Sequence, residues 1–278
     1  MDRGALGYWE TVAERWRIAP PLSPSAEDIR YYERKAQGCA DSQGNSFPLN
    51  ALLLGVTPGI VSMRWPEGTS LVAVDWSGGM FRSAWPRQGA PVGAAAVIGD
   101  WRELPFAPAR FDFAAGDGCY TALGSFQDGA RLNAELHRSL RPGGLLSIRC
   151  FCRPETPLRI ERLFEELAAG QVRNLDLLRW LTAMAVHGNS RGGVALQSVW
   201  KVWNERFPDL SALKAQFGWT EDAFANLERW SKLNMRYSFA TLGELRGLAA
   251  PHFELLEHEI PDYEWGECFP RLLMRARS

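Results

Sequence analysis

The sequence predicts an α/β fold, a doubly wound and mostly parallel sheet with a helical insertion after its fifth strand. Short apolar runs alternate with loop or helix patterns from Leu52 onward. Because these runs are apolar throughout, they suit strands that are covered on both faces. Residues from about 155 to 237 show only helical spacing and no strand pattern. The change of pattern predicts a helical segment inserted into the sheet.

The overall composition is that of a compact globular chain. Its 278 residues are 46% hydrophobic, enough for one large domain or one domain with an insertion. The 31 basic and 32 acidic side chains nearly cancel, so we expect neither nucleic acid nor a membrane as a partner. The first twenty residues lack the apolar segment of a signal peptide. We therefore expect a cytoplasmic protein.

Two helices are expected before the first strand. Tyr8, Trp9 and Trp16 have helical spacing, and the pattern stops at Pro20. Ser25 is a suitable N-cap for a second helix that runs out near Gly38.

The first five strands are predicted at 52–54, 71–74, 94–98, 111–115 and 145–150. Between the last two, Leu132, Leu136 and Leu140 share one helical face. The segment "RPGG" at 141–144 is expected to end that helix and to turn into the fifth strand.

The remaining chain divides into a helical part and a closing part. Helices are expected around 160–167, 177–184 and 196–203. The segment "TLGE" from Thr241 to Glu244 is a capping box that begins another helix, and "FELLEHEI" and "RLLMRAR" follow as two strands. We expect three units: 1–152 with N-terminal helices and core, 153–238 as the insertion, and 239–278 completing the sheet.

The cysteines do not indicate a metal site. The five of them include no CxxC pair, and no His lies at ligand spacing. We therefore predict free thiols and no bound metal.

Chemistry-bearing residues stand at the ends of the predicted strands, where parallel sheets bind ligands. The first strand ends in "GVTPG", from Gly55 to Gly59, and the second in Asp75, twenty residues after Gly55. Asp100 and Asp117 end the next two. A strand-end Asp is more often a helix cap, but three in succession suit an adenosine cofactor. Such a cofactor needs an acid for the ribose, an acceptor for the adenine amino group and an apolar side chain against the ring.

Five segments resemble those of the class I S-adenosylmethionine-dependent methyltransferases, in order and in spacing. They are "ALLLGVTPG", "LVAVDWSGGM", "VIGDWRELPF", "FDFAAGDGCY" and "LHRSLRPGGLLSIRCF". The resemblance covers roughly 50–152, and "GYWETVAERW" is similar to the family's leading helix. It implies a Rossmann-like seven-stranded sheet with an antiparallel last strand, and S-adenosylmethionine as cofactor, with S-adenosylhomocysteine as product.

The resemblance also implies roles for residues by position. Those expected along the methionine part of the cofactor are Gly55, Thr57, Gly59, Asp117 and Gly118, with a looser match of Tyr8 to the carboxylate. Those expected around the ribose and adenine are Asp75 for the ribose, Trp76 and Met80 for the ring, and Asp100 with Trp101 for the amino group.

The glycine loop departs from the family pattern at two positions. Leu53 stands where the family has an acid, and Thr57 replaces the middle glycine. Asp117 or a backbone carbonyl must then hold the cofactor's ammonium, while the Thr57 hydroxyl can bond its carboxylate. These departures keep open a second hypothesis, a degenerate binding or regulatory module without catalysis.

An NAD-dependent dehydrogenase is a third hypothesis, because its fingerprint is also rich in glycine. That fingerprint is G-x-G-x-x-G, and the loop from Gly55 to Gly59 lacks its second glycine and misplaces its third. The "RPGG" segment also has no role in a dehydrogenase.

For a methyltransferase, most of the rate can come from positioning the acceptor in line with the methyl group. A hydroxyl or protonated amine would also need a general base, for which His187 and Asp117 are the candidates. We expect the insertion to form a lid that builds the pocket for a small, partly apolar methyl acceptor.

Overall fold

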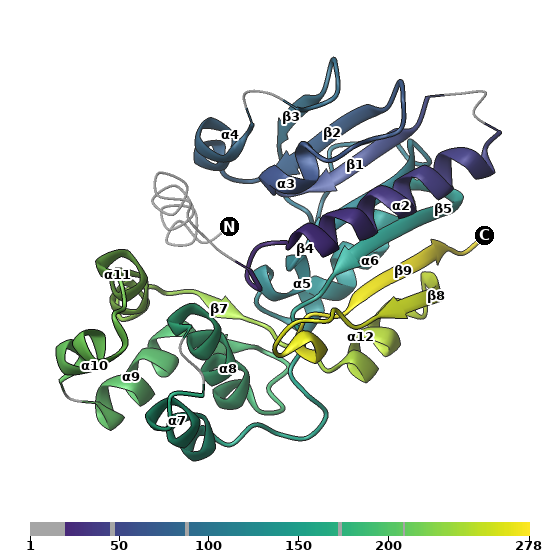
Figure 1. The fold of residues 1–278 in the computed structure, drawn as a ribbon. Helices are drawn as coiled ribbons and strands as arrows, with labels where there is room; N and C mark the ends of the chain where they lie inside the picture. The colour runs from purple at the N-terminus through teal and green to yellow at the C-terminus, as the bar shows by residue number, and fades with distance from the viewer. Residues whose placement is uncertain (1–19, 45–47, 87–88, 172–173, 208) are drawn as a thin grey trace.

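The computed structural model describes residues 20–44, 48–86, 89–171, 174–207 and 209–278. Its core is one seven-stranded sheet in the order β3-β2-β1-β4-β5-β9-β8 (Figure 1). The strands are β1 (Asn50–Leu54), β2 (Ser70–Asp75), β3 (Ala95–Ile98), β4 (Phe111–Asp117), β5 (Leu140–Arg149), β8 (Phe253–Glu259) and β9 (Arg271–Ala276). The first five are parallel, and β9 is antiparallel to both of its neighbours. The predicted doubly wound fold and its antiparallel last strand are confirmed.

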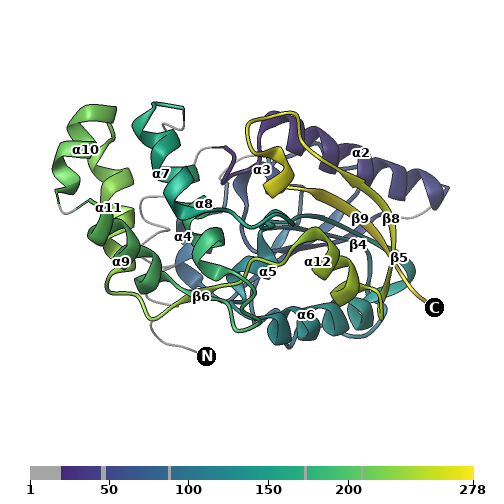
Figure 2. The ribbon, with the colours of Figure 1, turned by 90° about the horizontal axis from the view of Figure 1, so that it is seen from below.

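Helices cover both faces of this sheet. Figure 2 shows α2 (Ala26–Ser42) above the strands, with α6 (Phe126–Ser139) and α12 (Leu242–Ala249) below them. Short helices α3 (Pro58–Val61), α4 (Gly78–Ala84) and α5 (Cys119–Ala122) follow β1, β2 and β4. The apolar strands β1, β2 and β4 are therefore buried between two layers of helices.

The predicted helix caps are present. Ser25 and Asp28 form a reciprocal capping box at the start of α2, and Thr241 and Glu244 form another at α12. Gly38 does not end α2 as expected, because the helix continues to Ser42 and keeps burying apolar residues on its inner face.

Two local predictions differ from the structure. The "RPGG" segment lies inside β5, where the pairing jumps from Phe111–Leu140 to Phe113–Leu145. The extra residues form a bulge, and Gly143 takes its positive φ of 78°. The strand β3 is also not covered on both faces: it is the edge strand, and Ile98 is 68% exposed.

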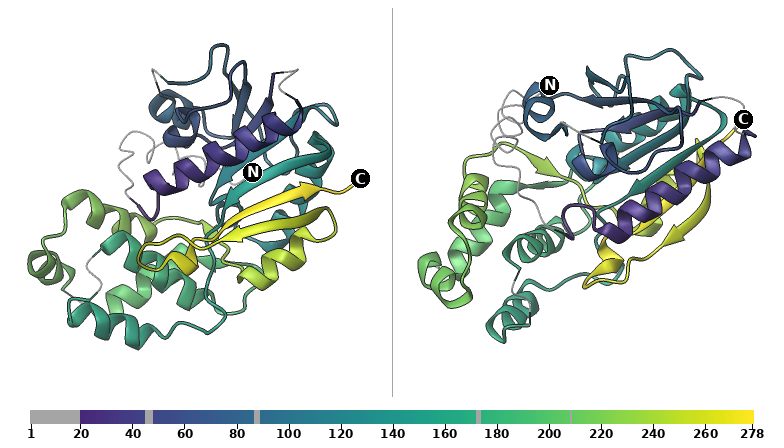
Figure 3. Two further views of the ribbon diagram at one scale, coloured as in Figure 1. Left: turned by 45° about the vertical axis from the view of Figure 1, so that its right-hand side comes forward. Right: turned by 45° about the horizontal axis from the view of Figure 1, so that its top comes forward.

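The insertion consists of α7 (Ile160–Ala168), α8 (Leu175–His187), α9 (Leu196–Arg206), α10 (Leu210–Phe217) and α11 (Glu221–Trp230). These helices lie beside the sheet rather than on its faces (Figure 3). They pack around a core that contains Trp203 and Trp230 and that also takes in Leu22, Phe151 and Phe269 from outside the insertion. The expectation of a strand-free segment is wrong, because β6 (Val194–Ala195) pairs with β7 (Arg236–Tyr237). Two-residue strands are too short to leave a pattern in the sequence.

Three further observations concern composition. All five cysteines are buried and free. Among the described residues, no group of three or more His, Cys, Asp or Glu side chains is placed to hold a metal ion. No helix in the same residues is both long and apolar enough to span a bilayer.

Candidate functional site

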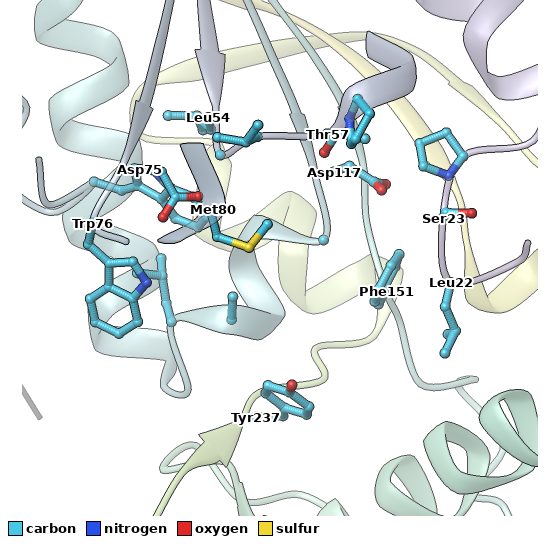
Figure 4. A pocket seen from close by; sticks show the side chains of 18 of the residues that line it. Leu22, Ser23, Leu54, Thr57, Asp75, Trp76, Met80, Asp117, Phe151 and Tyr237 are labelled. Carbon is cyan, nitrogen blue, oxygen red and sulfur yellow. The ribbon is translucent and has the colours of Figure 1, made fainter. Parts of the chain in front are cut away.

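A cavity of about 390 Å³ lies at the carboxyl ends of the parallel strands. One wall comes from the strand ends and the loops that follow them. The opposite wall comes from the insertion, with Arg179, Trp180, Trp230 and Tyr237, and a third part from Leu22 to Pro24 before α2. Figure 4 shows Asp75, Trp76 and Met80 on one side and Leu22 and Ser23 on the other, with Tyr237 across from the strand ends. The cavity therefore joins segments that are far apart in the chain.

Every predicted cofactor residue that the structure describes lines this cavity. These residues are Gly55, Thr57, Gly59, Asp75, Trp76, Met80, Asp100, Trp101, Asp117 and Gly118. Tyr8 lies outside the described residues.

Gly55 is required where it stands. Its φ is +84°, a conformation that side chains rarely adopt, and its N–H donates to the Val74 carbonyl at 2.8 Å. A Cβ there would lie 3.3 Å from Trp101 Cζ2 and 3.7 Å from Asp75 Oδ2. The glycine therefore leaves free the space between Asp75 and the Trp101 indole.

Gly59 has a second role that the sequence did not reveal. A Cβ at this position would lie 3.0 Å from Ile29 Cδ1 of α2. The missing side chain therefore lets α3 pack closely on α2, which fixes the loop that borders the cavity.

Asp75 is a buried carboxyl group at the end of β2. Its Oδ1 accepts the N–H of Ser77 at 2.8 Å. Burial raises the pKa of Asp75 to about 6, while hydrogen bonds from the backbone of Ser77, Val56 and Trp76 oppose the rise. The group is thus ionised at neutral pH but poorly solvated, which makes it a strong acceptor for hydroxyl donors in the cavity.

Asp100 lies at the end of β3 and pairs with Arg102. Arg102 Nη2 is 2.6 Å from Asp100 Oδ2, and Arg102 Nε is 2.9 Å from Oδ1. This pairing holds the pKa of Asp100 below its usual value. Asp100 therefore remains a charged acceptor, and Arg102 is an additional cavity residue that the sequence did not single out.

Asp117 forms a two-pronged ion pair with Arg149 of β5. Arg149 Nε is 2.7 Å from Asp117 Oδ1, and Nη2 is 3.0 Å from Oδ2. Burial raises the pKa of Asp117, and the guanidinium opposes that rise. Both carboxylate oxygens already accept from this guanidinium, so a proton taken up by Asp117 would compete with the ion pair. The general-base role of Asp117 stays a prediction.

Arg149 also holds the segment before α2. Its side chain is fully buried, and its Nη1 donates to the Pro21 carbonyl at 2.6 Å. Because Leu22 to Pro24 form part of the cavity wall, Arg149 connects that wall to Asp117. A single arginine within the apolar run "LLSIRCF" was the available sequence signal.

The two variant positions of the glycine loop lie differently. Leu53 is fully buried in the cluster between the sheet and α2, and it is not among the described residues that line the cavity. Thr57 lines the cavity at the N-cap of α3 without a side-chain capping bond. Its hydroxyl is therefore free to serve a ligand.

His187 does not reach the cavity formed by the described residues. It is 2% exposed, its Nδ1 is 3.0 Å from the Gly188 carbonyl oxygen, and its ring packs on Phe126 and Phe239. Burial lowers its pKa. The expected base role for His187 therefore has no geometric support, because α8 turns the ring into the protein interior.

The insertion wall is aromatic. Trp180 stacks on Tyr237 with ring centroids 5.0 Å apart, and Phe151 meets Trp180 edge-on at 5.0 Å. The guanidinium of Arg179 lies over the Trp230 ring at 4.6 Å. Helical spacing alone could not tell these side chains from ordinary core residues.

Strand order, the antiparallel β9 and a strand-end cavity with Gly55, Asp75 and Asp100 define a Rossmann-like methyltransferase architecture. Residues 52–148 match the family model described as a methyltransferase domain. Over residues 52–148 the α/β core is therefore a methyltransferase domain, and S-adenosylmethionine is the cofactor of such domains.

Solved structures share the fold at low identity. The N-methyltransferase NodS from Bradyrhizobium japonicum, in complex with S-adenosylhomocysteine, is 10% identical with a TM-score of 0.52, covering 99% of this chain and 100% of its own. A Rhodobacter sphaeroides protein provisionally named a zinc-dependent alcohol dehydrogenase is 12% identical with a TM-score of 0.60, covering 100% of both chains. No curated protein sequence matches this chain significantly. At these identities the likenesses show the fold alone.

Proposed function

We propose that this protein transfers the methyl group of S-adenosylmethionine to a small, partly apolar molecule. The observation that carries the proposal is that one cavity joins the strand-end acids to the aromatic wall of the insertion. A cofactor held at the strand ends would present its reactive group toward that wall. The insertion would then act as the lid and hold the acceptor.

The residues at the strand ends fit the cofactor. Asp75 is an ionised, buried acceptor suited to the two ribose hydroxyls. Trp76 and Met80 offer apolar surface for the adenine, Asp100 offers an acceptor for its amino group, and Thr57 offers a free hydroxyl. When bound, S-adenosylmethionine supplies an electrophilic methyl carbon on a sulfonium.

The amino-acid end of the cofactor is the least conventional part of the site. Each Asp117 carboxylate oxygen has a lone pair that Arg149 does not use, so Asp117 stays our candidate for the ammonium group. Since Arg149 holds it, we assign it a binding role and no proton transfer.

Positioning is the main contribution that these residues can make to the reaction. Trp180 packs against both Phe151 and Tyr237, which gives the acceptor a rigid wall. Fixing an acceptor behind an electrophilic carbon removes most of the entropic cost of the encounter. His187 does not line the cavity formed by the described residues, and Arg149 holds Asp117, so we favour an acceptor that is nucleophilic without a base.

Isothermal titration with S-adenosylmethionine, S-adenosylhomocysteine and NAD tests the proposal. We expect both sulfur compounds to bind one site per chain and NAD to bind far more weakly. Absence of binding by both sulfur compounds would rule out the methyltransferase, and tight NAD binding would favour a dehydrogenase.

A second candidate function is a cofactor-binding module without catalysis. It is favoured by Leu53, which is buried away from the cavity where the family has an acid. Incubation with S-adenosylmethionine and a panel of small aromatic and aliphatic acceptors separates the two. Formation of S-adenosylhomocysteine, measured by mass spectrometry, supports the enzyme, whereas binding without turnover on every acceptor supports the module.

A further inference from the structure

Arg179 lines the cavity and carries buried hydrogen-bond donors that have no partner. The residue is 6% exposed, and only its Nη2 has a partner, Asp176 Oδ1 at 2.8 Å. Its Nε and Nη1 are buried without any hydrogen-bond partner. Leaving the donors of a buried cation unsatisfied is costly. Such a group is therefore a candidate for a ligand contact.

Trp230 adds a second donor at the same place. Its ring lies under the Arg179 guanidinium at 4.6 Å, and its buried Nε1 has no partner. Among the described residues that line the cavity, these two are the only ones with a buried side-chain nitrogen or oxygen left unsatisfied. All of the unsatisfied atoms are N–H donors. A ligand that completes this wall must bring acceptor oxygens, and the cation favours a negative charge on them.

We propose that Arg179 selects a methyl acceptor that carries a carboxylate on an aromatic or otherwise flat apolar body. This proposal rests on the proposed function. The flat body suits the wall of Phe151, Trp180 and Tyr237, whose rings already pack edge-on and stacked. The carboxylate accepts from Arg179 Nη1 and from the second N–H of Nη2, the two nitrogens at the end of the guanidinium, after a small movement of the side chain. This planar fork matches the two carboxylate oxygens.

The amino-acid end of S-adenosylmethionine also has a carboxylate. This cofactor carboxylate is the other group that Arg179 could bind. Arg179 lies on α8 of the insertion with Trp180, whereas the residues that fit the cofactor lie at the strand ends and in the Gly55 to Gly59 loop. We therefore assign Arg179 to the acceptor. Its loss should leave cofactor affinity unchanged.

The test uses pairs of aryl carboxylates and their carboxamides, benzoate with benzamide and indole-3-acetate with indole-3-acetamide. Each is titrated into the full-length protein saturated with S-adenosylhomocysteine. We expect the carboxylates to bind about tenfold or more tightly than their carboxamides. Equal binding within the pairs, or binding by no member of either pair, would overturn the proposal.

Variants then test whether the preference for carboxylates over carboxamides depends on Arg179. Arg179→Gln should abolish it, and Arg179→Lys should retain part of it because the charge remains without the fork. Asp176→Asn is the matched control: it removes the ion-pair partner and should keep the preference. A preference that persists in Arg179→Gln would overturn the proposal.

The cofactor titration separates this inference from the proposed function. A loss of S-adenosylhomocysteine affinity in Arg179→Gln, with the fold retained by circular dichroism, would assign Arg179 to the cofactor carboxylate and overturn the inference. A wild-type protein that binds no S-adenosylhomocysteine would instead refute the proposed function.

Discussion

At the scale of single residues, Asp75 shows how burial can oppose folding and favour binding. Its pKa of about 6 lies above the ordinary value of 3.8 because the carboxylate is poorly solvated. The native state then binds more protons than the unfolded state between about pH 4 and 6. Its contribution to stability therefore falls as the pH rises through that window, and the loss is complete at neutral pH.

Asp75→Asn should for this reason stabilise the ligand-free protein at pH 7, by about 1–3 kcal/mol. The amide keeps an oxygen for the Ser77 N–H and carries no charge. The same change should weaken S-adenosylmethionine binding, since the ribose loses a charged acceptor. Urea denaturation and calorimetric titration measure the two effects. A variant that is less stable and binds normally would contradict both.

The pKa of Asp75 also predicts how cofactor affinity depends on pH. In the proposed site the ionised carboxylate would accept both ribose hydroxyls, so the affinity should fall as the pH drops below about 6, by up to about tenfold per pH unit. Titrations with S-adenosylhomocysteine between pH 5 and 8 measure this fall. Asp75→Asn should show a flat profile in that range, and a flat wild-type profile would remove Asp75 from the ribose site.

At the scale of elements, β5 acts through Arg149 as the connection between the cavity and the chain before α2. Arg149→Met should cost about 3–5 kcal/mol, because the buried Asp117 loses its counterion. It should also weaken cofactor binding, because the Leu22 to Pro24 wall loses its contact at Pro21. Urea denaturation and titration with S-adenosylhomocysteine report the two losses.

The double variant Arg149→Met with Asp117→Asn is the control for this pair. Removing the unpaired charge should recover part of the lost stability, and a double-mutant cycle gives the coupling energy. A double variant as unstable as the sum of the two single variants would show that the ion pair is not coupled.

At the scale of the whole molecule, the cavity lies between two packed regions. The sheet has its own clusters, and the insertion helices pack around another, which includes Trp203 and Trp230 and also Phe151 and Phe269 from the sheet part. Trp76 at the end of β2 packs against the insertion core, so it links the two regions directly. Ligands that fill the cavity should therefore order both walls.

Hydrogen exchange should distinguish ligand binding at the strand-end wall of the cavity from binding at the insertion wall. S-adenosylhomocysteine alone should protect the amides of 55–59, 75–80 and 99–102, because these segments hold the cofactor side of the cavity. Addition of an aryl carboxylate should then protect α8 and α11. Helix α7 contributes no described residue to the cavity and serves as the internal reference. Uniform protection of all helices would contradict a two-walled site.

The sequence by itself determined the fold and the strand-end side of the cavity. The residues that follow each parallel strand can be located from the sequence, because every parallel strand places its last residues at the same edge of the sheet. Gly55, Asp75 and Asp100 could therefore be found from spacing and resemblance alone, and all of them line the cavity.

Only the tertiary structure decided which side chains of the insertion line the cavity and which charged groups are buried together. His187 and Arg179 stand on the same helix, and the direction of α8 turns the first into the interior and the second to the cavity wall. Arg149 reaches Asp117 across 32 positions of the chain. Contacts of this kind depend on how helices pack and on which charges are buried together. Neither leaves a periodic pattern in the sequence, so Arg179 and Arg149 became visible only in the folded chain.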